Sequence, residues 1–178
     1  MKKQILLPII TLLLAALLLF AVSFGLRSIA AQVAQRDQLY LMQTLLPDSG
    51  EFTEEAYDGE DDVIRTVYKA ENGYVIETAT KGYVDEIVML VGVSNEGSVT
   101  GVVVRELHET VGLGAGALTD WQFLSQFLNT KGDAEIGKDV DAITGATVTS
   151  KAIARCVNSA VGFVTGADVD SGATSWGG

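Results

Sequence analysis

Residues 86–105 read EIVMLVGVSNEGSVTGVVVR, two apolar runs joined by a short polar segment. The first run, 86–93, and the second, 99–105, are rich in valine and other residues that favour strands. Between them, Asn95, Glu96 and Gly97 are typical of a tight hairpin turn. This stretch predicts an antiparallel β-hairpin, and with it a sheet at the centre of the fold.

Weaker strand patterns precede the hairpin, and helical patterns follow it. Residues 63–69 alternate loosely between apolar and polar, and 74–78 are rich in strand formers. Thr119 and Gln122 have capping-box spacing, which predicts a helix that begins at this box and includes Trp121. A last helix over 150–164 would present an apolar face to the sheet. We therefore expect an α+β fold, an antiparallel sheet with packing helices, whose helical apolar positions are Trp121, Phe123, Leu124, Phe127, Leu128, Ile153, Val157, Val161 and Val164.

The N-terminal part has the composition of a membrane span. Residues 4–26 contain no charged side chain, and a helix of this length would exceed the roughly 30 Å hydrocarbon core of a bilayer. Lys2 and Lys3 precede the run, so the positive-inside rule places the N-terminus in the cytoplasm and the domain on the extracytoplasmic side of the cell membrane. A cleaved signal peptide, with Ala30 and Ala31 near its end, is the alternative.

The chain divides by composition into four parts. We expect a cytoplasmic N-terminus and transmembrane helix over 1–26, a helical stalk over 27–50, an extracytoplasmic domain over 51–166 and a flexible tail over 167–178. Residues 51–62 carry seven carboxylates, which predicts a solvated loop. A calcium site is the alternative there, although the spacing matches no EF-hand loop.

Charge and residue counts exclude several classes of function. The formal net charge is −11, so the chain lacks the basic footprint of a nucleic-acid-binding protein. Its single cysteine, Cys156, excludes an intrachain disulfide and a thiolate metal cluster and is predicted to lie in the core. Its single histidine, His108, forms neither a triad nor a metal site by itself. We therefore predict no catalytic residue and no metal ligand.

A glycine-rich segment follows the hairpin, with glycines at positions 112, 114 and 116. The spacing G-x-G-x-G differs from the G-x-G-x-x-G of dinucleotide-binding folds, and no phosphate-binding P-loop is present. The segment is either a flexible turn or a place where the backbone closely approaches a flat ligand.

Residues 141–150 read DAITGATVTS and lie just before the last predicted helix. Short hydroxyl side chains and Gly145 at a helix start would suit an anion, because the first backbone amides of a helix lack partners. The simpler interpretation is a helix N-terminus capped by Thr149 or Ser150. No histidine or lysine adjoins Thr147 in sequence, so a covalent modification of this residue would require another protein.

Two motifs in this order resemble the FMN-binding domain family. Asp141 to Thr147, DAITGAT, resembles the flavin attachment motif D-x-x-[S/T]-G-A-T, and Glu109 to Gly114, ETVGLG, resembles the segment E-T-P-G-L-G, with Val111 in place of proline. The similarity covers about residues 74–165. With the predicted anchor, the chain looks like the G subunits of Rnf complexes, the ion-pumping ferredoxin:NAD⁺ oxidoreductases. The C subunits of sodium-pumping NADH:quinone reductases are the nearest relatives.

This resemblance implies an electron-carrying subunit that is not catalytic alone. FMN would be joined by a phosphoester bond to Thr147 and installed by a separate flavin transferase that uses FAD and magnesium. The implied partners are this transferase, the other subunits of the complex and membrane lipid. Alternatives are a C-type subunit, another extracytoplasmic flavin carrier, or a non-redox scaffold. The implied contacts are recognition elements at Asp141, Thr144, Gly145 and Ala146, phosphate-binding hydroxyls at Thr149 and Ser150, and a flavin-lining set at Glu109, Thr110, Gly112, Leu113 and Gly114.

Overall fold

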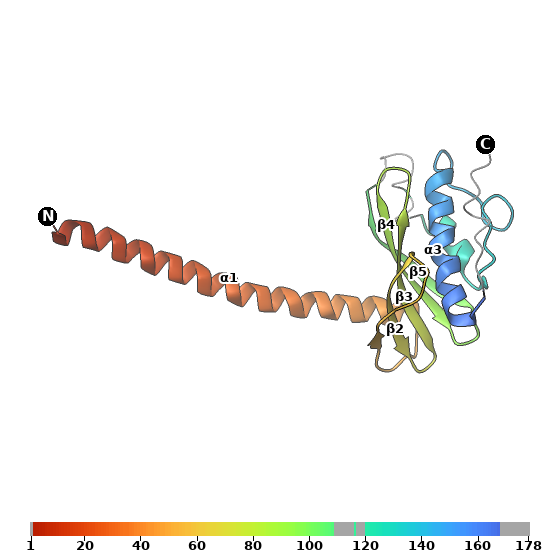
Figure 1. Cartoon of the computed structure of the whole chain (residues 1–178), viewed down its shortest axis with the longest axis horizontal. Coiled ribbons are helices and arrows are strands. Elements are labelled where there is room, and N and C mark those ends of the chain that lie inside the picture. Colours follow the sequence, from red (N-terminus) through yellow and green to blue (C-terminus); the bar gives the residue numbers. More distant parts are fainter. Residues whose placement is uncertain (1, 109–115, 117–119, 168–178) are drawn as a thin grey trace. The chain divides into compact units, whose positions relative to one another are not determined.

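The fold centres on a five-stranded antiparallel sheet in which each strand pairs with its sequence neighbours, in the order β1-β2-β3-β4-β5 (Figure 1). The computed structural model describes residues 2–108, 116 and 120–167. Its helices and strands are α1 (Lys2–Leu45), β1 (Thr53–Glu55), β2 (Ile64–Ala70), β3 (Gly73–Lys81), β4 (Glu86–Ser94), β5 (Val99–Leu107), α2 (Trp121–Leu124), the 3-10 helix η2 (Ser125–Phe127) and α3 (Thr147–Thr165).

The predicted central hairpin is confirmed as β4 and β5. Their pairing runs from Ile87 opposite Leu107 to Val93 opposite Val99. The predicted strands over 63–69 and 74–78 are confirmed as β2 and β3, and β3 extends three residues further to Lys81. It does so because β3 is hydrogen-bonded on both sides, and its partner β4 is equally long. The α+β fold, with an antiparallel sheet and packing helices, is therefore confirmed.

The sequence predicts a loop over the acidic segment 51–62, but part of this segment forms a strand. Residues 53–55 form the short edge strand β1, whose three residues pair with Lys69, Tyr68 and Val67 of β2. All three β1 side chains are exposed, so no apolar periodicity marks the strand. Backbone pairing with β2 therefore decides this conformation, and composition alone could not reveal it.

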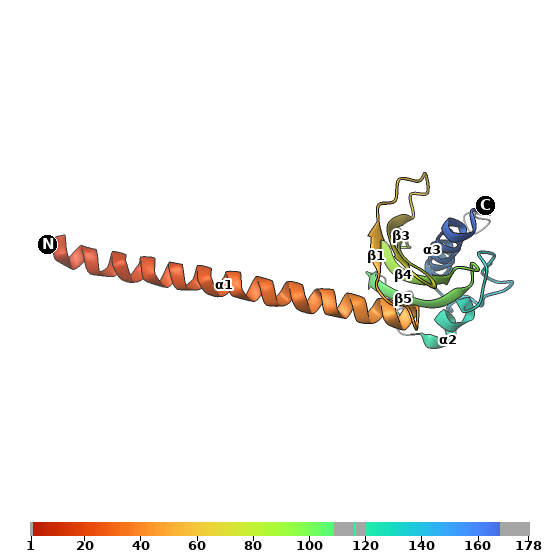
Figure 2. The ribbon, with the colours of Figure 1, turned by 90° about the horizontal axis from the view of Figure 1, so that it is seen from below.

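The two faces of the sheet bury separate groups of side chains. Figure 2 shows α3 lying against the concave face. Successive residues of β3 and β4 point to opposite faces. Thus Ile76, Met89 and Val91 belong to the large core beneath α3, whereas Val75 and Leu90 face the other way. The predicted apolar face of the last helix is confirmed, since Ile153, Val157 and Val161 are fully buried in the core beneath α3.

The second face is covered by the last turn of α1 and the residue after it. Met42, Leu45 and Leu46 pack there with Ala70, Val75 and Leu90. Two glycines opposite each other in the β4–β5 pairing, Gly92 and Gly101, allow this close approach. The hydroxyl of Thr100 donates a 2.6 Å hydrogen bond to the backbone oxygen of Leu45. Residues 41–46, predicted as stalk, thus pack on the domain.

The chain divides into two units, Met1–Tyr40 and Leu41–Gly178. The first unit is helical. α1 continues to Leu45, and residues 46–50 are not helical. Among the residues that the structure describes, no helix combines the length and the apolar character needed to cross a bilayer. The membrane span over 4–26 therefore stays a prediction.

The helix after the glycine-rich segment is shorter than predicted and is capped differently. Asp120 is its N-cap, and its carboxylate accepts a 3.0 Å hydrogen bond from the amide of Phe123. The predicted cap, Thr119, lies outside the described residues. After four residues, α2 tightens into η2, and the chain leaves the helix at Leu128. Phe123 and Phe127 are buried and contact each other edge to face, with ring centroids 5.3 Å apart.

Candidate functional site

The threonine-rich segment forms a tight turn that leads directly into α3. The amide of Ala146 donates to the carbonyl of Ile143 at 2.9 Å, which closes a four-residue turn. Gly145, the third residue, has φ +76°. Side chains disfavour this conformation, and type II turns require it at this position. The glycine of the motif is thus needed for the backbone to reach α3.

α3 begins at Thr147, three residues earlier than predicted. Its N-cap, Ala146, provides no side-chain hydrogen bond. Ser150 is the first residue whose amide donates back along the helix, to the carbonyl of Ala146 at 2.9 Å. The amides of residues 147–149 therefore have no partner within the helix. The predicted capping by Thr149 or Ser150 is wrong, because both residues lie inside the first turn.

The exposed residues of the motif gather at this helix start. Thr147 is exposed, as are Asp141, Thr144 and Gly145, whereas Ala146 is only 6% exposed. The Thr147 hydroxyl therefore lies at the surface, beside amides without helical partners at the positive end of the helix dipole. Such a position favours a negatively charged group.

Ser150 connects this helix start to the turn before it. Its hydroxyl is fully buried, accepts a 3.0 Å hydrogen bond from the amide of Ile143 and donates a 3.0 Å bond to the carbonyl of Ala146. Thr149 is also buried, at 1% exposure. The resemblance implies that both hydroxyls contact a phosphate, but the structure places both inside the protein. Ser150 instead holds the turn over 143–146 in place.

We expect Ser150→Ala to loosen this turn, because the partly buried amide of Ile143 would lose its acceptor. The free energy of unfolding should fall by about 1–2 kcal/mol. Hydrogen exchange at the Ile143 amide should accelerate by more than the global change explains. Ser125→Ala is the control, because the hydroxyl of Ser125 donates an exposed 3.3 Å bond to the carbonyl of Gln122. Equal exchange at Ile143 in wild type and S150A would contradict this role.

A groove of about 830 Å³ adjoins the turn. One wall comes from α2 and η2 and the other from the start of the motif, where the amide of Asp141 donates to Gln126 Oε1 at 2.8 Å. Sequence reasoning missed Gln122 and Gln126, although their spacing of four marks the polar face of the predicted helix. The lining residues are Gly116, Asp120, Gln122, Phe123, Ser125, Gln126, Asp141, Ala142, Ile143 and Thr144.

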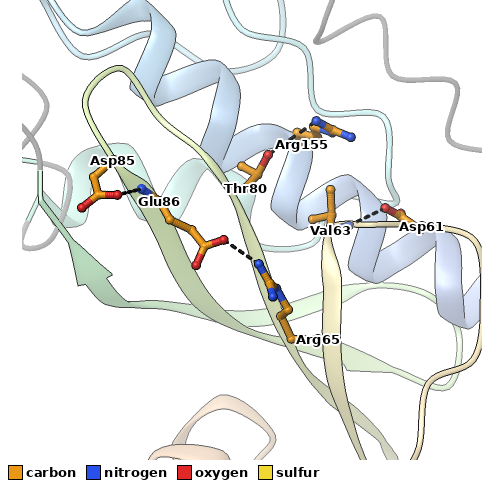
Figure 3. A network of polar contacts seen from close by, with 7 residues as sticks. All are labelled: Asp61, Val63, Arg65, Thr80, Asp85, Glu86 and Arg155. Atoms are coloured by element: carbon orange, nitrogen blue, oxygen red, sulfur yellow. Dashed lines mark hydrogen bonds and ion pairs between the residues drawn. The ribbon is translucent and has the colours of Figure 1, made fainter.

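Arg155 connects α3 to β3 and to the segment before β2. Arg155 extends from α3 to Thr80 at the end of β3, with 3.5 Å between Nη1 and Oγ1 (Figure 3). Its Nη2 pairs with Asp62 Oδ1 at 2.9 Å.

On the sheet, Arg65 pairs with Glu86 at 2.5 Å. His108 is exposed and lies 3.9 Å from Asp85. No group of metal-ligating side chains occurs among the described residues.

The predicted core position of Cys156 is confirmed. Its side chain is fully buried on α3. Burial raises the pKa of its thiol to about 12, because the charged thiolate would lose its solvation, and the nearby hydroxyl of Thr78 lowers this pKa only in part. The thiol is therefore a packing group without reactive character at neutral pH.

The flavin-lining residues that the resemblance implies fall on a part of the chain that the structure does not describe. These residues are Glu109, Thr110, Gly112, Leu113 and Gly114. Gly116, just after them, lines the groove, together with Asp141 and Thr144 of the motif. The structure thus brings the motif together with the helix that follows the glycine-rich segment.

Comparison with known proteins gives a match to a domain family, matches to related subunits and a match to a solved structure. Residues 82–162 match a family model described as the FMN-binding domain. The G subunit of the proton-translocating ferredoxin:NAD(+) oxidoreductase complex of Clostridium ljungdahlii is 34% identical over 168 residues, which cover 88% of this chain and 87% of that protein. The G subunit of the Na(+)-translocating complex of Acetobacterium woodii is 38% identical over 98 residues, or 50% and 47% of the two chains. The solved structure of the C subunit of the Na(+)-translocating NADH-quinone reductase from Parabacteroides distasonis has a TM-score of 0.49 and 21% identity, covering 65% of this chain and 76% of that chain.

Proposed function

This chain belongs to the family of G subunits of ion-translocating ferredoxin:NAD⁺ oxidoreductase complexes, and on that premise we propose that it carries FMN covalently on Thr147. It acts as a redox subunit of such a complex and is not catalytic alone. Bound FMN would supply reversible electron transfer between redox centres of the complex, while the protein fixes the position and environment of the flavin.

The observation that carries this proposal is the position of Thr147. It is the first residue of α3, it is exposed, and no side chain caps the helix before it. Gly145 and Ala146 add little bulk beside its hydroxyl. A phosphate joined to Thr147 would lie next to the amides of residues 147–149, where the helix dipole stabilises negative charge.

Attachment requires chemistry that the chain does not provide by itself. The Thr147 oxygen would form a bond to the FMN-side phosphorus of FAD, and the pyrophosphate bond would break. AMP would leave with the electron pair of that bond. The hydroxyl proton would pass to a base of the flavin transferase, which would also hold magnesium. Exposure of Thr147 is consistent with this, because a second protein must reach the hydroxyl.

We propose that the flat part of the cofactor binds in the groove beside the turn. The groove volume of about 830 Å³ lies within the ordinary range of cofactor sites. Phe123 and Ile143 provide apolar walls, and Gln122, Gln126 and Asp141 provide polar groups. Asp141 and Thr144 would contact the flavin or the transferase there, and the segment 109–114 would complete the site.

We also propose the remaining parts of the arrangement. Residues 4–26 would anchor the protein as a single membrane span, with the domain on the extracytoplasmic side. The absence of charge in 4–26 and the lysines before it support this topology. Besides lipid, the partners would be the other subunits of the complex and the transferase that loads it.

Thr147→Ala should abolish covalent flavin, because no other atom at this position can form the phosphoester. Wild type and variant are each co-expressed with a flavin transferase, and in-gel ultraviolet fluorescence is measured after denaturation. Thr53→Ala is the matched control, since Thr53 is an exposed threonine on β1. We expect fluorescence in wild type and T53A and at least about a hundredfold less in T147A, the size of effect typical when an essential reacting group is lost.

Two results would count against this assignment. Fluorescence of T147A equal to wild type would place the flavin elsewhere. Colourless wild-type protein, with the transferase shown to be active on another substrate, would return the chain to a scaffold role.

A further inference from the structure

Residues 156–162 of α3 are buried on all sides, whereas its first half exposes a single stripe. From Thr147 to Arg155, the side chains not buried are those of Thr147, Val148, Lys151 and Arg155. Residues four apart on a helix are neighbours on one face. Thr147, Lys151 and Arg155 therefore form one line along the helix surface, with Lys151 one turn after the proposed attachment residue.

The charges on α3 are arranged against its dipole. Its first turn has no acidic residue and its last turn no basic residue, and Lys151 and Arg155 both lie in the N-terminal half. Cations near a helix N-terminus are unfavourable unless an anion balances them. Arg155 has such an anion, because Asp62 lies 2.9 Å away. Thr80 also contacts Arg155 (Figure 3).

Lys151 lacks an anion of this kind. Among the described residues, no carboxylate lies within ion-pair distance of its ammonium group. The side chain is nevertheless partly buried. Most other cations of the domain do have carboxylate partners within the same distance. These are Arg65, Lys69, Arg105, Lys138 and Arg155.

We propose that Lys151 is a positioning residue that binds the phosphate joining FMN to Thr147. This inference rests on the proposed attachment. The Cβ atoms of residues four apart lie about 5–6 Å from each other, and helical side chains lean toward the N-terminus. The ammonium group can therefore reach a phosphate on Thr147. A phosphodiester keeps one negative charge, and Lys151 would donate a charge-assisted hydrogen bond to it.

The arrangement would hold the phosphate from two directions. The amides of residues 147–149 face it from the end of the helix, and Lys151 faces it from the side. Because Arg155 is held by Asp62 and Thr80, Lys151 is the cation of this stripe that is available to neutralise the phosphate. The first turn would thereby gain the anion that its own side chains do not provide.

The test compares wild type with Lys151→Gln, Lys151→Arg and Lys69→Gln, each expressed with a flavin transferase. Lys69→Gln is the control. It also removes one positive charge, but from β2, near the other end of α3. Lys69 lies over the ring of Tyr74, which contacts Phe163, and Phe163 is about 24 Å along the helix from Thr147. The readouts are the rate of covalent attachment and the phosphorus-31 resonance of the attached flavin.

Loss of one charge-assisted bond should slow attachment in K151Q by about tenfold. In loaded K151Q, the phosphorus resonance should move from its wild-type position, and K151R and K69Q should remain close to wild type. A K151Q protein that never gains covalent flavin, beside a fully flavinylated K151R, would also support the need for a positive charge at position 151.

An unchanged phosphorus resonance in loaded K151Q would overturn the proposal, as would loss of loading in both K151Q and K151R. A wild-type chain without covalent flavin would contradict the attachment at Thr147 instead. Covalent flavin in the wild-type protein therefore distinguishes the two failures.

Discussion

Replacing Asn158 with alanine should lower the free energy of unfolding of the domain by about 2 kcal/mol. Asn158 lies on α3 and pairs twice with the backbone of Ala134 in the loop over 129–140. Its Oδ1 accepts from the Ala134 amide at 3.1 Å, and its Nδ2 donates to the Ala134 carbonyl at 3.0 Å. Both contacts are buried, so truncation would leave a buried amide and a buried carbonyl without partners.

Two effects of this substitution oppose each other. Unpaired buried polar groups cost about 1–3 kcal/mol, whereas alanine in a helix gains about 0.5 kcal/mol over asparagine. The cost dominates, so N158A is destabilised. Pulse proteolysis of the full chain across a urea series measures the change. Ser159→Ala is the control, because Ser159 is the adjacent buried polar residue on α3. Equal stabilities of N158A and S159A would contradict a stabilising role for the two hydrogen bonds between Asn158 and Ala134.

Gly92→Ala should destabilise the domain by about 2–3 kcal/mol, because there is no room for a methyl group. A Cβ at this position would lie 2.5 Å from the backbone oxygen of Leu45 and 2.6 Å from Thr100 Oγ1. These two atoms are hydrogen-bonded to each other. The methyl group would break that bond and displace residues 41–46 from the sheet.

The displacement of residues 41–46 can be measured locally. The amide of Leu46 donates to the carbonyl of Met42 at 2.9 Å, so its hydrogen exchange reports the end of α1. We expect faster exchange at Leu46 in G92A, together with the loss of global stability. Gly50→Ala is the control, since a Cβ there meets nothing within 4 Å. An unchanged Leu46 exchange rate in G92A would contradict the close approach.

Sequence pattern was sufficient where apolar residues dominate a strand or recur at helical spacing. The apolar runs of β4 and β5 and the spacing of Ile153, Val157 and Val161 on α3 predicted both the hairpin and the helix. Pattern failed where tertiary pairing decides the conformation. The exposed strand β1 and the division of the predicted helix after Gln122 into α2 and η2 are such cases. Strand pairing and loop packing leave no periodic trace in such short segments.

The candidate site was predictable in part. The motif with Gly145 and Thr147 could be found from residue types and order, because a turn glycine and a hydroxyl at a helix start have local signatures. The inward direction of Ser150 could not be found, because it depends on where α3 begins. The role that we propose for Lys151 could not be inferred from the sequence either, since it depends on how Arg155 is paired.

Because the thiol of Cys156 is buried and unreactive, the protein is suited to site-specific labelling at an introduced cysteine. Its sequence contains no other cysteine, and a pKa of about 12 leaves almost no thiolate to react with a maleimide. A cysteine introduced at an exposed position would then be the single labelled site in an otherwise natural chain. A membrane-impermeant reagent applied to intact cells would report on which side of the membrane that position lies.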